Sequence, residues 1–139
     1  MPNIFEKLNL KSHREILALN VPSFFEPELA ALSEVNVLRE ASGNEAVQFV
    51  LAFVSKQAEV DRLSPLLSAR LEGDGLIWFA YPKGSSKKYS SELNRDHGWD
   101  VLRQHGFDTV RQVAIDEDWS ALRFRRVEFI KAGKTAHSQ

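Results

Sequence analysis

The sequence predicts a three-layer α/β fold: an open sheet of about six strands, mostly parallel, with one antiparallel strand in a C-terminal hairpin. Uniformly apolar runs at 46–54 and 75–81 are typical of parallel strands that helices cover on both faces. The last two strand-like segments, 109–116 and 120–129, are separated by only "EDW". A connection that short fits antiparallel neighbours.

Strands and helix-like segments alternate along the chain. Strands are expected at 15–20, 35–40, 46–54, 75–81, 109–116 and 120–129, and helices at 22–33, 56–71 and 92–106. The second strand is short and half polar, as an edge strand is. The second helix has one apolar stripe, but Pro65 after Ser64 predicts a kink or a restart. The third helix is expected to be capped near Asn94 and to end at Gly106.

One domain accounts for this chain of 139 residues. We expect residues 1–130 to form a single α/β domain and 131–139 to form a flexible C-terminal tail. The alternation of strands and helices, followed by the terminal hairpin, predicts an open sheet in the strand order 2-1-3-4-6-5, with strand 6 antiparallel.

Bulk composition argues against several classes of function. The net charge of −1 argues against a general nucleic-acid-binding or membrane-surface protein. The absence of cysteine excludes thiol chemistry, and the four histidines show no metal-ligand spacing, so neither a metal nor a cofactor is expected. The charged N-terminus and the lack of a long apolar run predict a cytoplasmic bacterial protein.

Charged, hydroxyl and aromatic side chains follow the strands at their predicted carboxyl edge, where open α/β sheets bind ligands. The candidate ligand-binding residues are Lys83, Ser85, Ser86, Lys87, Arg95, Asp96, Trp99, Asp116, Asp118 and Trp119. Ammonium, guanidinium and hydroxyl groups favour an anion, and an indole offers a flat face to a base. The sequence therefore predicts a binding module for a small anionic or nucleotide-like ligand.

Two alternatives stay open at this stage. In the first, Lys83 and Arg95 pair with Asp116 or Asp118 and only lock the hairpin to the loop. In the second, the protein is an interaction or regulatory subunit, pairing with itself as a homodimer or with a partner through strand 35–40 or an aromatic patch around Phe24 and Phe25. No catalytic residue is identified, because "GSSKK" is not a phosphate-binding Walker loop and no nucleophile elbow is present.

The segment 68–83, "SARLEGDGLIWFAYPK", resembles a passage of class I S-adenosylmethionine-dependent methyltransferases, in which a glycine-containing turn leads into an apolar strand. The terminal hairpin is also similar to the end of that fold. From residue 76 onward, and more loosely over most of 7–127, the chain resembles a family of small bacterial proteins catalogued as a domain of unknown function. The resemblance implies a shrunken, Rossmann-like methyltransferase sheet and implies no activity.

Methyltransferases of this fold bind S-adenosylmethionine at a glycine-rich turn after the first strand. Here that turn reads "LNVPSFFEPEL", and no glycine precedes Gly43. Pro22 removes an N–H, and Phe24 and Phe25 would crowd the pocket. Glu40 could hold a ribose or be a surface carboxylate. A degenerate methyltransferase is therefore a further alternative.

Overall fold

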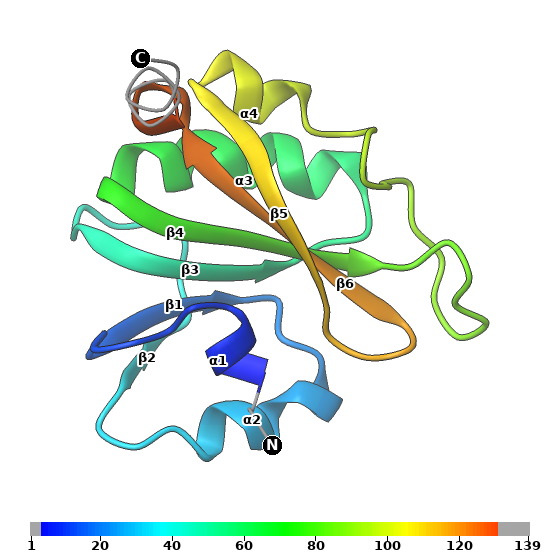
Figure 1. The fold of residues 1–139 in the computed structure, drawn as a ribbon, viewed down its shortest axis with the longest axis horizontal. Helices are drawn as coiled ribbons and strands as arrows, with labels where there is room; N and C mark the ends of the chain where they lie inside the picture. The colour runs from blue at the N-terminus through cyan, green and yellow to red at the C-terminus, as the bar shows by residue number, and fades with distance from the viewer. Residues whose placement is uncertain (1–3, 131–139) are drawn as a thin grey trace, which may run out of the picture.

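The computed structural model describes residues 4–130, which form one sheet between two layers of helices (Figure 1). The strands are β1 (Glu15–Leu19), β2 (Asn36–Leu38), β3 (Val47–Phe53), β4 (Leu71–Pro82), β5 (Phe107–Ala114) and β6 (Trp119–Arg126). The helices are α1 (Ile4–Lys7), η1 (Ser23–Phe25), α2 (Glu26–Ala30), α3 (Gln57–Arg70) and α4 (Asp100–Gln104). The predicted tail, 131–139, lies outside the described residues. No helix within residues 4–130 is long and apolar enough to cross a membrane.

The six strands of the sheet are ordered β2-β1-β3-β4-β6-β5. Strands β2, β1, β3 and β4 run parallel, and β6 is antiparallel to both of its neighbours. This confirms the predicted order and the predicted antiparallel strand. The β5–β6 hairpin places Ser120 opposite Tyr81 of β4, so the turn of the hairpin reaches the carboxyl end of β4.

Each face of the sheet buries its own apolar cluster, because successive residues of a strand point to opposite faces. The face under α3 and α4 buries Leu17, Val50, Ala52, Ile77, Phe79, Leu122, Phe124, Val60, Leu63, Leu67 and Leu102. The face under α1 and α2 buries Ile16, Ala18, Phe49, Leu51, Phe53, Trp78, Ala121, Phe5, Leu8, Phe25 and Leu29. Figure 1 shows the two helix layers on opposite sides of the sheet. The uniformly apolar strands of the sequence are thus covered on both faces, as predicted.

The predicted restart of the helix at Pro65 is wrong, because α3 runs unbroken through this residue, and the kink stays a prediction. Pro65 cannot donate to the carbonyl of Asp61. Both residues lie on the exposed side of α3, where solvent can bond that carbonyl. Ser64 is fully buried, and its hydroxyl donates to the carbonyl of Val60 at 2.6 Å, so it does not cap a new helix.

The helix predicted over 92–106 is reduced to the short α4. The Asn94 side chain accepts the N–H two residues further on, and the Asn94 and His97 backbones exchange two hydrogen bonds. Gly98 follows with φ of +108°, which is outside the helical region. Asn94 therefore closes a local turn, and the helix starts only after Gly98. The predicted stop at Gly106 is confirmed, since α4 ends just before it and its φ is +87°.

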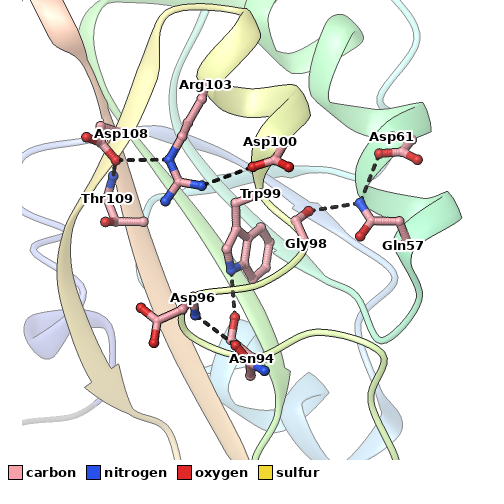
Figure 2. Close-up of polar contacts among 10 residues, drawn as sticks. All are labelled: Gln57, Asp61, Asn94, Asp96, Gly98, Trp99, Asp100, Arg103, Asp108 and Thr109. Carbon is pink, nitrogen blue, oxygen red and sulfur yellow. Dashed lines mark hydrogen bonds and ion pairs between the residues drawn. The ribbon is translucent and has the colours of Figure 1, made fainter.

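The segment that precedes α4 is fixed by polar contacts to α3 and by the indole of Trp99 (Figure 2). Gln57 donates to the Gly98 carbonyl at 2.9 Å and to the Asp61 carboxylate at 3.0 Å. The Trp99 indole N–H donates to the Asn94 carbonyl at 2.7 Å. Non-helical backbone is held in place here because its carbonyls find side-chain donors.

Candidate functional site

The loop after β4 and the turn between β5 and β6 meet at the carboxyl edge of the sheet. The Lys83 N–H donates to the Asp118 carbonyl at 2.8 Å. The Ser86 hydroxyl donates to the Asp118 carboxylate at 2.9 Å. Two segments more than thirty residues apart in sequence thus share one edge, as the predicted topology requires.

Ser86 and the two aspartates organise this edge internally. The Ser86 hydroxyl oxygen accepts the N–H groups of Lys88 and Tyr89 at 3.2 and 3.1 Å. One carboxylate oxygen of Asp116 accepts the N–H groups of Asp118 and Trp119, both at 2.8 Å. These side chains therefore satisfy the backbone of a tight turn and of the loop that packs on it.

The cations of the edge have no such partners. Within residues 4–130, neither Lys83 nor Arg95 forms an ion pair. The interpretation that these two cations pair with Asp116 or Asp118 is therefore wrong. The connection between loop and hairpin is made by a backbone N–H and a serine hydroxyl, because Asp116 and Asp118 are already engaged by nearer donors.

Both cations line a cleft of about 550 Å³ between the loop, the segment around Asn94 and the β5–β6 hairpin. Its lining residues are Tyr81, Lys83, Gly84, Asn94, Arg95, Gln112, Ala114 and Ser120. No carboxylate is among them. Two cations without a lining carboxylate favour an anion, although the Asp96 carboxylate lies near enough to act on the pKa of Tyr81.

Polar but uncharged groups complete the cleft. The Gln112 amide donates to the Tyr81 hydroxyl oxygen at 3.3 Å. Burial raises the pKa of Tyr81, and among nearby charges Arg95 lowers it while Asp96 raises it. The phenol is therefore neutral at physiological pH, and its own proton is available to a bound acceptor.

Six residues of the cleft lining are missing from the sequence-derived set: Tyr81, Gly84, Asn94, Gln112, Ala114 and Ser120. Four of them, Tyr81, Gln112, Ala114 and Ser120, lie on the strands themselves, whereas the sequence-derived set took residues that follow the strands. The hairpin register pairs Tyr81 with Ser120 and Ser120 with Ala114, which places all three in one row of the cleft wall. Counting residues back from the hairpin turn would have placed Ser120 opposite Ala114.

Neither tryptophan of the predicted set presents a ring face to a ligand. Trp99 is fully buried and packs against the rings of Phe79 and Phe124. Trp119 is 6% exposed and belongs to the cluster on the other face of the sheet, between Phe53 and Tyr89. Both indoles are therefore core residues. Their packing holds in place the segment before α4, which contains Trp99, and the start of β6, which contains Trp119.

The remaining predicted residues, Ser85, Lys87 and Asp96, are exposed and lie outside the cleft lining. Within residues 4–130, no group of three or more histidine and acidic side chains is placed to hold a metal ion. The structure thus divides the predicted set into cleft cations, turn-forming side chains, core indoles and exposed residues.

A smaller hollow, of about 310 Å³, lies near the amino end of β4, and its charged groups already have partners. Glu72 accepts a hydrogen bond from Gln48 at 2.7 Å. Asp74 accepts two from the guanidinium of Arg125 at 2.8 and 2.6 Å. Groups that satisfy one another in this way favour a structural role over a ligand role.

The turn after β1 is filled by side chains. Phe25 is 1% exposed, with its ring centroid 5.0 Å from that of Phe53. Phe24 is 41% exposed and lies 6.2 Å from the Trp119 ring. Of the predicted aromatic patch, only Phe24 is therefore accessible. This turn contains a proline and two phenylalanines, whereas a glycine-rich cofactor-binding turn would leave its backbone open to the cofactor.

Comparison with solved structures finds a similar fold in several methyltransferases. The glycopeptide N-methyltransferase MtfA, solved with S-adenosyl-L-methionine, is similar at 11% identity and a TM-score of 0.57, with 88% of this chain and 85% of that chain covered. The N-methyltransferase NodS from Bradyrhizobium japonicum WM9 is similar at 14% identity and a TM-score of 0.53, with 88% and 92% covered. The fibrillarin pre-rRNA processing protein of Methanococcus jannaschii is similar at 14% identity and a TM-score of 0.53, with 84% of this chain and 67% of that chain covered.

These likenesses show a methyltransferase-like, Rossmann-like fold and confirm the predicted fold class. No protein-family model matches the chain, and no curated protein is similar to it in sequence. The resemblance to a family of small bacterial proteins therefore stays a prediction.

Proposed function

We propose that this protein is a non-enzymatic binding module that holds a small anionic, nucleotide-like ligand in the cleft at the carboxyl end of β4. One observation carries the proposal. Lys83 and Arg95 line the same cleft of about 550 Å³, no carboxylate lines it, and neither cation has an ion-pair partner within the described residues.

The chemistry of the cleft suits an anion that carries a flat or polar body. An ammonium group and a guanidinium group together favour phosphate or carboxylate, and the guanidinium can grip either with two hydrogen bonds. The neutral hydroxyls of Tyr81 and Ser120 and the Gln112 amide can bond the uncharged part of the molecule. The volume lies within the range of sites for small ligands and cofactors, roughly 300–1,000 Å³.

The proposal is tested by calorimetry with adenosine monophosphate, inorganic phosphate and citrate. We expect one of these anions to bind the unaltered protein, and Lys83→Gln and Arg95→Gln each to weaken its binding by about tenfold or more. Because both cations lack partners, each variant should unfold within about 0.5 kcal/mol of the parent. Lys87→Gln is the matched control, since Lys87 is exposed and lies outside the cleft lining, and it should change neither quantity.

Two results would contradict the proposal. One is that no anion of the panel binds. The other is that Lys83→Gln and Arg95→Gln bind as the parent does but lose several kcal/mol of stability, which would assign both cations to the fold.

The likeness to a methyltransferase solved with its cofactor favours a second candidate, a degenerate S-adenosylmethionine-binding protein. Its site would be the turn after β1, which Pro22, Phe24 and Phe25 occupy here. The two candidates place their ligands at different strands. Calorimetric binding of S-adenosylmethionine that survives Lys83→Gln and is lost in Ser23→Trp, with the fold retained, would favour the second candidate, and a flat titration would remove it.

A further inference from the structure

A second group of basic side chains lies on the opposite face of the sheet from the cleft. The strand registers align Trp78 of β4, Arg123 of β6 and Arg111 of β5 in one row across the sheet. Trp78 belongs to the cluster under α1 and α2, whereas Tyr81 of the cleft belongs to the cluster under α3 and α4. The row therefore shares no wall with the proposed anion cleft.

Arg123 differs from Arg70, Arg125 and Arg126, which are also buried or half-buried, in having no acceptor within residues 4–130. Arg70 donates to three backbone carbonyls and Arg126 to three others. Arg125 makes a two-pronged ion pair with Asp74. The Nε of Arg123 is buried and has no hydrogen-bond partner among the described residues. This Nε is covered by the protein itself, as is the unpartnered indole Nε1 of Trp119, whereas the two Nη groups of Arg123 are accessible and also have no acceptor within residues 4–130.

The surroundings of Arg123 add like charge. Arg111 stands directly opposite on β5, where side chains of an antiparallel pair are about 4.5–5.5 Å apart at Cβ. Burial lowers the pKa of Arg123, as do the charges of Arg125 and Arg111, and only Asp74 opposes them. A guanidinium stays protonated in any case, so the charge remains. Because Asp74 is already bonded to Arg125, the pair Arg123–Arg111 lacks a counter-charge of its own.

We propose that the Arg123–Arg111 pair forms a second anion site that takes the phosphate group of a small molecule. Arg123 presents its two accessible Nη groups as a two-pronged donor, and Arg111 completes the contact from the exposed edge strand. The anion supplies the missing acceptor and separates the two like charges. The chain has a net charge of −1, which favours a single phosphate group over a polyanion.

Nuclear magnetic resonance with inorganic phosphate tests this site, with the Nε–Hε signal of Arg123 as the direct reporter. Phosphate is expected to shift that signal together with backbone amides of β5 and β6. Arg111→Gln should weaken the binding by about tenfold. Arg62→Gln, an exposed arginine of α3, is the matched control and should leave the binding unchanged.

The double variant Lys83→Gln with Arg95→Gln separates this site from the cleft. It should abolish anion binding in the cleft and leave the Arg123 response intact, so that either site can fail without the other. An Arg123 signal that does not move, or the same affinity in Arg111→Gln, would overturn the proposal. So would a short single-stranded oligonucleotide that moves the signal where inorganic phosphate does not. Arg111 is exposed on an edge strand, so this variant is expected to fold even if Arg123→Gln does not.

Discussion

Removal of the Ser86 hydroxyl tests how the loop after β4 is held to the hairpin turn. This hydroxyl donates to the Asp118 carboxylate at 2.9 Å and accepts the N–H groups of Lys88 and Tyr89. Ser86→Ala therefore takes away one charge-assisted hydrogen bond and leaves two exposed N–H groups to water. We expect a loss of about 1–2 kcal/mol in the free energy of unfolding.

The assay is denaturant unfolding at neutral pH, followed by a thermal scan. For a chain of this length, a change of that size lowers the melting temperature by about 3–7 °C. Ser85→Ala is the matched control, because the neighbouring Ser85 is exposed and has no hydrogen bond within the described residues. Amide exchange at Tyr89 should accelerate in Ser86→Ala and stay unchanged in Ser85→Ala.

A double-mutant cycle with Asp118→Ala isolates the side-chain pair. We expect a coupling of about 1 kcal/mol between Ser86 and Asp118, because the Asp118 carbonyl keeps its separate bond from the Lys83 N–H. If Ser86→Ala and Ser85→Ala unfold at the same denaturant concentration, the loop is held by its backbone alone and the reasoning fails.

Two further predictions concern the backbone before α4 and the amino end of the sheet. Gly98→Ala should lower the free energy of unfolding by about 2–3 kcal/mol, because φ is +108° and a Cβ would overlap the buried Leu93 side chain. Gly73→Ala is the control: φ is +52° there and the space for a Cβ is open. It should lose only about 1 kcal/mol in the same denaturation assay. Burial lowers the pKa of His13, so the unfolded chain binds the imidazole proton more readily than the folded protein does. The free energy of unfolding should therefore fall as the pH drops below 6.5, the ordinary pKa of histidine. It should level off below the pKa of His13 in the folded state. His13→Gln should flatten that part of the stability profile, and an unchanged slope would show that other groups produce it.

The sequence by itself determined the architecture, for local physical reasons. Apolar runs without alternation require cover on both faces, and a three-residue connection between two strands requires an antiparallel pair. Together with the alternation of strands and helices, these two constraints predicted the strand order and the edge at which Lys83 and Asp118 meet. The sequence prediction failed for 92–106. The apolar spacing there suited a helix, but the Asn94 side chain accepts a nearby backbone N–H and Gly98 has a positive φ, and both oppose helical backbone.

Tertiary structure alone decided what the edge residues do. The same stretch of sequence supplies Lys83, which lines a cleft without an ion-pair partner, and Ser86, which is part of the scaffold. Trp99 proved to be core because its indole N–H finds the Asn94 carbonyl beneath the surface. Whether a charge is paired depends on which donors and acceptors the fold brings within about 3 Å of it, and that distance is set by strand register and packing and not by residue type.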